Sequence, residues 1–573
     1  MKITGSQIVI ECLVEQGVKT VFGYPGGAIL NIYDELYKNS DRITHILTAH
    51  EQAACHAADG YARSTGKVGV CMATSGPGAT NLVTGIATAY MDSIPIVAIT
   101  CNVPKVLLGK DSFQEIDIAG VTMPITKHNF MVMDVKDLAS TIREAFVIAK
   151  SGRPGPVLID IPKDVTAALY DFEPLSNPDE AVSEISLDRA NLKRSISISK
   201  PSSQEIQNAA QMINEASRPI IYAGGGVKIS GAELELLELA EKADIPVSES
   251  LMGRDVFPAK HPLCTWMVGM HGTNASNLGI TNSDLVIAIG ARFSDRVLGD
   301  PKHFAANSKV LHIDIDPAEI NKNISTDACL VGDVKQVLKE LLPLVNSTKH
   351  PEWISKIEEW KKDIPECYNK EPVDSINPKF ICETINNIAG DDTFITTEVG
   401  QHQMWTAQFY PFNKPKTFNT SGGLGTMGYG TGAAMGIQFA NPKSRVVHIA
   451  GDGSFRMNCN ELATIQHYNL PIVIVVVNNG SLGNVRMWQK LFYENRFSQT
   501  TLDFGPDWVK LAAAYGIDGF KANSAKEFEE VFEKAFKLNK PCIIDAKVDM
   551  DEMVLPMVPG GKPIDQPIMS WQN

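Results

Sequence analysis

The sequence lacks the features that mark membrane, secreted and disulfide-rich proteins. Its longest apolar run, residues 470–477, is far shorter than the roughly 20 residues that a membrane-spanning helix needs. Residues 1–17 mix polar, apolar and acidic side chains, so no signal peptide is predicted. The ten cysteines include no Cys-x-x-Cys pair. This pattern predicts reduced thiols in a cytoplasmic protein, and neither a disulfide framework nor a zinc site.

The chain also lacks any run rich in arginine and lysine, and its net charge is -14. An acidic surface repels the phosphate backbone, which argues against non-specific binding to nucleic acid. Hydrophobic residues make up 44% of the chain and charged residues 21%, which is typical of globular proteins.

The length and the pattern of apolar segments predict a chain of several α/β domains. A chain of 573 residues corresponds to three or four domains at about 150 residues each. Short apolar segments alternate with amphipathic ones, which predicts parallel sheets covered by helices on both faces. The predicted strands include residues 43–47, 67–73, 94–100, 156–161, 219–223, 285–289, 310–315, 446–450, 470–477 and 542–548.

Polar, proline-rich stretches divide these segments into three domains. We predict domains at residues 1–168, 201–345 and 378–548, joined by linkers at 169–200 and 346–377. A tail rich in proline and glycine follows at residues 549–573. Three consecutive α/β units of similar size suggest an ancient duplication.

The most informative motif is Gly451-Asp452-Gly453, followed after an apolar stretch by Asn478-Asn479. Each motif follows a predicted buried strand, so an acid and an amide lie at the ends of neighbouring strands. Such oxygen ligands suit Mg²⁺, with waters and a bound phosphate completing the coordination. The glycines leave room for a diphosphate to approach backbone N–H groups at the start of the following helix. Each motif alone would more often be a simple turn, but together they predict a magnesium-diphosphate site.

The order of strand, Gly-Asp-Gly, helix, strand and Asn-Asn resembles the thiamine diphosphate (ThDP) signature. In that signature, Asp452 and Asn479 would bind Mg²⁺ together with the main-chain carbonyl of Ser481. ThDP also needs a shielded carboxyl group against its aminopyrimidine ring, which helps to deprotonate the thiazolium carbon. The candidate is Glu51, at the start of a helix after the strand at 43–47. Its alternative role is that of a first-turn glutamate stabilised by the helix dipole.

Matching motifs extend along nearly the whole chain, which resembles the catalytic subunit of the acetohydroxyacid synthase (acetolactate synthase) family. The matching segments are residues 21–27, 50–54, 74–81, 113–115, 153–156, 161–165, 269–272, 290–296, 399–405 and 554–559. The resemblance implies three α/β domains of the ThDP-binding type, with an FAD-binding domain in the middle and the tail capping the active site.

The resemblance also implies an activity. The enzyme would decarboxylate pyruvate on ThDP and transfer the hydroxyethyl group to pyruvate or 2-ketobutyrate. That reaction is the first common step of valine, leucine and isoleucine biosynthesis. Its partners would be a second or further copies of the chain, in a homodimer or homotetramer, and a small regulatory subunit. Glu51 and Asp452 would meet across the dimer interface.

The resemblance assigns roles near the reacting carbons to Phe113, Gln114 and Lys163. Arg296 would bind the carboxylate of the second keto acid, because a guanidinium matches a carboxylate with two hydrogen bonds. Trp488 would form the wall of the acceptor pocket and favour an ethyl over a methyl group. Taken singly, Trp488 could be a core residue, Arg296 part of a surface ion pair and Lys163 a solvated lysine.

The resemblance implies that Met427 lies under ThDP and holds it bent. The other residues of the implied ThDP site are Pro25, Gly26, Ser75, Asn81, Val399, Gly400, Gln401, His402, Gly425, Gly451, Gly453, Ser454, Leu482, Gly483, Asn484 and Val485. The chain departs from the family at Ser481, where histidine is usual, and at Thr431-Gly432, where Leu-Pro is usual. Asn484 and Arg486 replace usual methionines, a departure that bears on the shape of the substrate channel.

The middle domain carries a glycine-rich turn, Gly224-Gly225-Gly226, after a predicted strand. Such a turn is a weak dinucleotide signal by itself, but Arg292 and residues 312–316 lie at the ends of other strands, where ligands bind in open α/β sheets. The resemblance implies a structural FAD held by Arg153, Gly224, Gly225, Gly226, Met270, His271, Gly290, Arg292, Asp314, Ile315, Glu319 and Asp333. The alternatives are an FAD-independent catabolic acetolactate synthase and a pyruvate oxidase.

Overall fold

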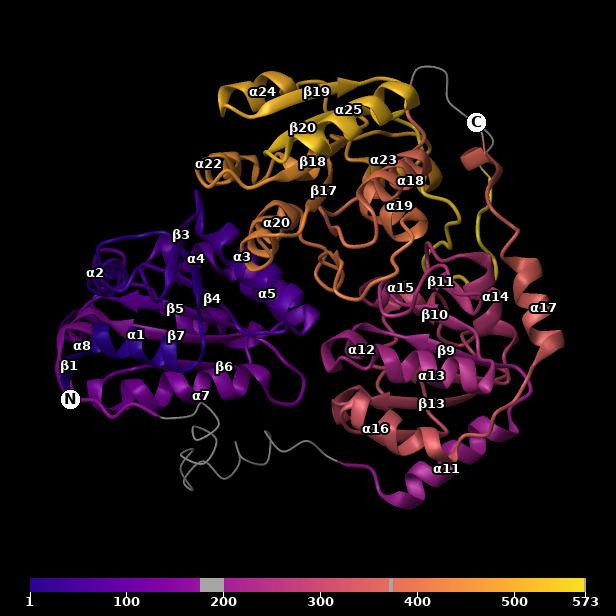
Figure 1. Cartoon of the computed structure of the whole chain (residues 1–573), viewed down its shortest axis with the longest axis horizontal. Coiled ribbons are helices and arrows are strands. Elements are labelled where there is room, and N and C mark those ends of the chain that lie inside the picture. The colour runs from indigo at the N-terminus through magenta and orange to yellow at the C-terminus, as the bar shows by residue number, and fades with distance from the viewer. Residues whose placement is uncertain (176–199, 370–374, 571–573) are drawn as a thin grey trace.

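The computed structural model describes residues 1–175, 200–369 and 375–570 (Figure 1). They form three α/β domains, each built on a six-stranded parallel sheet with helices on both faces. Parallel strands buried on both sides require continuous apolar runs, and the central strands of each sheet consist mainly of buried Val, Ile, Leu and Ala. The prediction of three parallel-sheet α/β domains is confirmed.

The first domain, indigo in Figure 1, has the strand order β3-β2-β4-β5-β7-β6. Its strands are β2 (Thr20–Gly23), β3 (Thr44–Leu47), β4 (Gly69–Ala73), β5 (Ile96–Asn102), β6 (His128–Met131) and β7 (Val157–Pro162). Its helices are α1 (Gly5–Glu15), α2 (Leu30–Lys38), α3 (Glu51–Thr65), α4 (Pro77–Asn81), α5 (Val83–Asp92), α6 (Ile118–Thr122), α7 (Leu138–Lys150) and α8 (Lys163–Ala167). A small antiparallel pair, β1 (Lys2–Thr4) and β8 (Leu169–Asp171), joins the two ends of this domain.

The middle domain, magenta in Figure 1, has the order β11-β10-β9-β12-β13-β14. Its strands are β9 (Pro219–Ala223), β10 (Val247–Glu249), β11 (Cys264–Met267), β12 (Leu285–Ile289), β13 (Lys309–Asp314) and β14 (Ala328–Val331). Its helices are α11 (Ser203–Glu215), α12 (Gly225–Ser230), α13 (Glu233–Ala243), α14 (Asn274–Asn282), α15 (Asp295–Leu298) and α16 (Val334–Leu341).

The last domain, orange to yellow, has the order β16-β15-β17-β18-β20-β19. Its strands are β15 (Phe394–Thr397), β16 (Phe418–Asn419), β17 (Val446–Gly451), β18 (Ile472–Asn478), β19 (Asp518–Ala522) and β20 (Cys542–Lys547). Its helices are α18 (Pro378–Ala389), α19 (Gln401–Phe409), α20 (Tyr429–Ala440), α21 (Asp452–Phe455), α22 (Leu462–His467), α23 (Gly483–Phe492), α24 (Trp508–Ala514) and α25 (Ala525–Leu538). The predicted strands agree with these bounds to within two residues at each end.

The strand orders separate the middle domain from the other two. When strands are numbered within each domain, the first and last sheets both have the order 2-1-3-4-6-5. The middle sheet has the order 3-2-1-4-5-6, which is typical of dinucleotide-binding α/β folds. In that order the crevice for a ligand lies where the direction of strand succession reverses, between β9 and β12.

The first and last domains pack against each other through α3 and α20. A side chain at Gly60 of α3 would collide with the backbone of Ala433, and one at Gly436 of α20 with the backbone of Ala57. Gly432, part of the departure from the family pattern, likewise allows α20 to approach the side chain of His56. Small residues therefore let these two helices touch backbone to backbone.

The two predicted linkers differ in what the structure describes. Most of the stretch 169–200 lies outside the described residues, which exclude 176–199, but its start forms β8. The stretch 346–377 carries helix α17 (Pro351–Trp360), which packs on the middle domain. It does so because Trp353 is buried and donates from Nε1 to the Pro219 carbonyl at 2.9 Å.

The tail after β20 lies between the last and middle domains. Val554, Leu555 and Met557 are buried, and Val558 N donates to the Met270 carbonyl at 2.8 Å. Tyr368 donates its hydroxyl to the Met553 carbonyl at 2.9 Å. Across the described part of the chain, no helix is both long and apolar enough to cross a membrane.

Candidate active site

Glu51 is the first residue of α3, at the carboxyl edge of the first sheet. Its side chain is buried, with 9% of the residue exposed, and its Oε2 accepts a hydrogen bond from Asn81 Nδ2 at 2.9 Å. A side chain at Gly78 would come within 3.2 Å of Glu51 Oε1. The carboxylate is therefore shielded by a glycine-rich turn and oriented by one amide. The sequence predicted both Glu51 and Asn81 but not the contact between them.

The other predicted residues of this half lie on loops and at helix ends at the same edge of the sheet. Lys163, at the start of α8, donates from Nζ to the Gly27 carbonyl at 2.9 Å. Gly76, beside Ser75, lies so close to Gln114 that an added side chain would come within 2.9 Å of its Cα. Gln114 has a left-handed backbone, with φ 59°, which turns its loop toward Gly76.

The neighbouring Phe113 points into solvent, with 87% of the residue exposed. Gly26, next to Pro25, packs on the side chain of Thr74. The segments after β2, β3, β4, β5 and β7 thus carry the predicted residues of the first domain at one edge of the sheet.

Asp452 is the first residue of α21, directly after β17 in the last domain. Only 4% of the residue is exposed, and burial raises the pKa of its carboxyl group to about 7. The adjacent strand β18 delivers Asn479, whose Oδ1 accepts from Ser481 N at 3.1 Å. Asn479 Nδ2 donates to Gln401 Oε1 at 2.9 Å. The two motifs thus lie at the ends of paired strands, as the sequence predicts.

This edge has the chemistry that a magnesium ion and a diphosphate require. Among the described residues, His402 Nε2 and Ser481 Oγ are buried without a hydrogen-bond partner. Burial lowers the pKa of His402 to about 4, so the ring is neutral near neutral pH. A side chain at Gly451 would come within 2.6 Å of His402 Nδ1, and one at Gly483 would collide with Gln401. The oxygen ligands, the unpaired polar atoms and the backbone left open by glycine therefore fit a magnesium ion with a diphosphate.

Glu398 organises this edge and was missed by sequence reasoning. It is fully buried at the end of β15, and its Oε2 accepts from Ser454 Oγ at 2.8 Å and from Gly428 N at 2.7 Å. Its Oε1 accepts from Thr431 N at 3.1 Å. Glu398 therefore fixes the start of α20, beside Met427. Its partner Thr431 belongs to the Thr431-Gly432 pair, where the chain departs from the family pattern. The available signal in the sequence was an acidic residue directly before the predicted segment 399–402.

A cavity of about 1610 Å³ lies where the three domains meet. All twelve residues predicted around FAD line it: Arg153, Gly224, Gly225, Gly226, Met270, His271, Gly290, Arg292, Asp314, Ile315, Glu319 and Asp333. Val399, Gly425, Asn484 and Val485 line it from the last domain. Glu51, Gln114, Lys163 and Asp452 do not belong to its lining.

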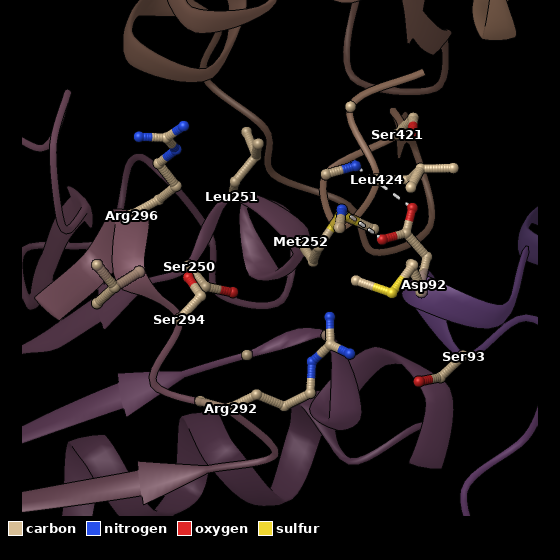
Figure 2. A pocket seen from close by; sticks show the side chains of 18 of the residues that line it. Asp92, Ser93, Ser250, Leu251, Met252, Arg292, Ser294, Arg296, Ser421 and Leu424 are labelled. Atoms are coloured by element: carbon tan, nitrogen blue, oxygen red, sulfur yellow. Dashed lines mark hydrogen bonds between the residues drawn. The ribbon is translucent and has the colours of Figure 1, made fainter. Parts of the chain in front are cut away.

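The glycines of the middle domain bring β9 and β12 together at the bottom of this cavity. Gly226 N donates to the Gly290 carbonyl at 3.0 Å, and a side chain at Gly226 would come within 2.7 Å of Gly290 Cα. Burial raises the pKa of Asp314 to about 6 and lowers that of the Arg292 guanidinium. In Figure 2, Arg292 reaches into the cavity from this side. Bare backbone at a reversal of strand order, with charged side chains around it, fits a dinucleotide.

The two residues predicted to select the acceptor are neighbours in the structure. Arg296 of α15 places its Cζ 5.8 Å from the centre of the Trp488 ring on α23, and both line the cavity. Arg296 is largely exposed, and Figure 2 shows it at the opposite side of the cavity from Asp92. An exposed guanidinium beside an indole wall can bind a small carboxylate.

Comparisons with known families agree with this geometry. Three family models described as "Thiamine pyrophosphate enzyme" match the chain. The N-terminal TPP binding domain matches residues 3–121, the central domain matches 206–341, and the C-terminal TPP binding domain matches 398–546. A probable acetolactate synthase large subunit from Methanocaldococcus jannaschii is 49% identical, over 97% of this chain and 94% of its own. An acetolactate synthase from Arthrospira platensis is 46% identical, over 98% and 96%. An acetolactate synthase large subunit from Pyropia yezoensis is 45% identical, over 98% and 94%.

Three ThDP-enzyme domains in one chain, with Glu51 and Asp452 at the edges of the outer two, define a thiamine pyrophosphate enzyme. With 45–49% identity over almost its full length, the chain belongs to the acetolactate synthase large-subunit family within that class. The prediction drawn from the motifs is confirmed at this level.

Proposed function

We propose that this chain decarboxylates pyruvate and joins the remaining two-carbon unit to a second 2-keto acid, either pyruvate or 2-ketobutyrate. The products are 2-acetolactate and 2-aceto-2-hydroxybutyrate, at the first common step of branched-chain amino acid biosynthesis. The observation that carries this proposal is the buried Glu51 carboxylate, oriented by Asn81 at 2.9 Å within a glycine-rich turn. That arrangement suits a group that shares a proton with a cofactor ring.

In this proposal each edge of the outer sheets holds one part of ThDP. When bound, ThDP supplies the electron sink for decarboxylation. Glu51 holds the proton at its carboxylate, and its burial excludes water from that exchange. Asp452, Asn479 and the Ser481 carbonyl would hold Mg²⁺, and the bare backbone at Gly451 and Gly453 would face the diphosphate. Phe113, Gln114 and Lys163, at the same edge as Glu51, would lie near the reacting carbons.

The acceptor keto acid would bind between Arg296 and Trp488. The guanidinium supplies two donors for the carboxylate, and the indole forms the wall against the side chain of the keto acid. One methylene against such a wall contributes only about 1–3 kcal/mol, so the pocket selects 2-ketobutyrate by preference.

The middle domain would hold FAD in the cavity as a structural cofactor, because the reaction has no net redox change. The strand order, the contact between Gly226 and Gly290 and the lining residues support this assignment. FAD bound there would contact all three domains.

We also propose that two copies of the chain form each active site. Exposed apolar side chains surround the Glu51 edge, where Phe113, Val106 and Leu30 are exposed. Others surround the Asp452 edge, where Met457 and Phe504 are exposed. Burial of such side chains is a strong driving force for association. The words "large subunit" in the names of relatives support a small regulatory subunit as a further partner.

The test is product analysis with pyruvate and 2-ketobutyrate in competition, with and without added ThDP, Mg²⁺ and FAD. We expect both products only when ThDP and Mg²⁺ are present, with no consumption of oxygen. Replacement of Trp488 by Leu should lower the ratio of aceto-hydroxybutyrate to acetolactate by about tenfold or more. Oxygen consumption with pyruvate and no carboligation product would instead favour a pyruvate oxidase.

A further inference from the structure

A buried ion pair faces the central cavity from the first domain. Arg63 of α3 donates from Nη2 to Asp92 Oδ2 at 2.8 Å, and both side chains are almost completely buried. Arg63 Nε also donates to Asp59 Oδ1 at 2.6 Å, and Asp59 accepts from the Tyr429 hydroxyl at 2.8 Å. Two carboxylates thus share one guanidinium, and the second carboxylate needs additional donors.

Asp92 obtains these donors from the last domain. Its Oδ1 accepts from Gly423 N at 2.7 Å, and its Oδ2 accepts from Gly422 N at 3.3 Å. Figure 2 shows the carboxylate pointing away from Ser93 toward the backbone between Ser421 and Leu424. The loop at residues 420–426 of the last domain is therefore held by the Asp92 carboxylate of the first domain.

Two more contacts fix the same loop from the first domain. Arg63 Nη1 donates to the Thr420 carbonyl at 3.0 Å, and Thr88 and Thr426 share a hydrogen bond of 2.7 Å between their Oγ1 atoms. A side chain at Gly423 would come within 2.7 Å of Asp92 Oδ1, so the loop rests directly on that carboxylate. From Thr420 to Thr426, the loop is thus held at both ends and in the middle.

The 420–426 loop leads directly into the cofactor side of the site. Ser421, Leu424 and Gly425 line the cavity, and Met427 follows immediately. Gly428, one residue further, is held by Glu398. Met427 thus lies between two fixed points, one set by Asp92 from the first domain and one by Glu398 within the last.

We propose that Asp92, together with Arg63, is a positioning residue that holds the 420–426 loop and so sets the place of Gly425 and Met427 at the cofactor. This assignment rests on the proposed function and extends it to a pair that lines the cavity and lies outside the residues assigned to the substrates. The buried pair couples the packing of the first and last domains to the geometry of the cofactor-facing loop.

The experiment compares Asp92→Asn, Asp92→Ala and Thr88→Val with the control Glu15→Gln. Glu15 is a matched control because it is also buried, pairs with Arg143 at 2.9 Å and accepts from a backbone amide, Leu175 N, at 2.9 Å. The first readout is hydrogen exchange of the amides in residues 418–428 of the full chain without added ligand. Loss of a charge-assisted hydrogen bond should speed exchange there by about tenfold or more in Asp92→Ala and less in Asp92→Asn.

The second readout is steady-state kinetics with ThDP and Mg²⁺ at saturation. We expect kcat to fall by about tenfold in Asp92→Ala, with KM for pyruvate nearly unchanged, and to fall less in Thr88→Val. The Glu15→Gln variant should keep both wild-type exchange in this segment and wild-type kcat. Wild-type exchange in both Asp92 variants, or an equal loss of kcat in Glu15→Gln, would overturn the proposal. Failure of the wild-type chain to form product would count against the proposed function alone, because the exchange measurement does not depend on it.

Discussion

The first and last domains have the same strand order, and each contains an equivalent hydrogen bond between two of its strands. Their sheet edges nevertheless carry different functional side chains. In the first domain, Asn102 ends β5 and donates from Nδ2 to Asp160 of β7 at 2.7 Å. In the last domain, Asn478 ends β18 and donates to Asp545 of β20 at 2.8 Å. We call these two contacts the Asn–Asp braces. Each joins the fourth strand of its domain to the sixth, two residues apart in register.

The difference between the two domains lies in the loops beyond this shared frame. After Asn478 the chain continues to Asn479, a residue of the proposed magnesium site, whereas after Asn102 it continues to the apolar Val103. The acid follows the third strand in the last domain, as Asp452, but the second strand in the first domain, as Glu51. One scaffold therefore carries two complementary chemistries, because loops at the carboxyl edge can change without disturbing the buried strands.

The largest effect should come from Glu51→Gln, which separates the roles of the two edges most clearly. Because a carboxyl group that exchanges a proton contributes about 10²–10⁴-fold to a rate, we expect kcat to fall by that factor. Binding of ThDP and Mg²⁺, measured by calorimetry, should remain close to that of the wild type. Near-full turnover in this variant would contradict the assignment of proton exchange to the first domain and of cofactor binding to the last.

The opposite signature should come from Asp452→Asn. Loss of one charged ligand should weaken the binding of ThDP and Mg²⁺ by about tenfold or more, since contacts to charged groups contribute about 1.5–3 kcal/mol. Turnover should recover in part at high Mg²⁺ concentration. A variant that loses turnover at every Mg²⁺ concentration, with unchanged cofactor affinity, would contradict the assignment.

The Asn–Asp braces can be compared directly by Asn102→Ala and Asn478→Ala. Removal of the Asn102 amide leaves a fully buried Asp160 oxygen without that donor, which should lower the free energy of unfolding by about 1–3 kcal/mol. Asp545 is slightly more exposed, so Asn478→Ala should lower it less. Urea denaturation measures both, with the exposed Asn282→Ala as the control. Equal stability of Asn102→Ala and wild type would show that the shared brace is not a stabilising element.

The smallest effect should be a dependence on pH of the packing between α3 and α20. Burial lowers the pKa of His56, which faces Tyr429, to about 4, below the ordinary value of 6.5. The unfolded chain therefore takes up a proton before the folded chain does. This contribution to stability is present above pH 6.5 and is lost as the pH falls toward 4.

As the pH falls from about 7 to about 5.5, the depressed pKa of His56 should lower the free energy of unfolding by about 1 kcal/mol. The His56→Gln variant should lose less stability over the same range, as measured by urea denaturation at each pH. An identical slope in both proteins would remove His56 as a cause.

The sequence predicts well those features that depend on local order along the chain. Residues such as Asp452 and Asn479 follow apolar strands directly, so the strand ends and the two motifs that follow them can be located from the order of residue types along the chain. The family resemblance implied which residues would surround FAD, among them Gly224, Arg292 and Asp314, and the structure gathers these residues around one cavity.

Contacts between domains were not predictable in this way. The bonds from Asp92 to Gly422 and Gly423 join positions more than 300 residues apart, and no local pattern in either segment indicates the other. Likewise, the polar composition of 346–377 hides a helix whose single buried face depends on Trp353. Strand order is also set by tertiary packing, so the likeness of the first and last sheets became visible only in the structure.

The separation of Glu51 from Asp452 within one chain has a genetic consequence. Glu51 contacts Asn81 and Gly78 in the first domain, while the environment of Asp452 is built by residues of the last. In the proposed two-chain site, each copy contributes its Glu51 to one centre and its Asp452 to the other. A cell that expresses the two impaired variants Glu51→Gln and Asp452→Asn together would then assemble mixed dimers in which one centre is fully wild type. Two alleles that each fail alone would restore growth in combination.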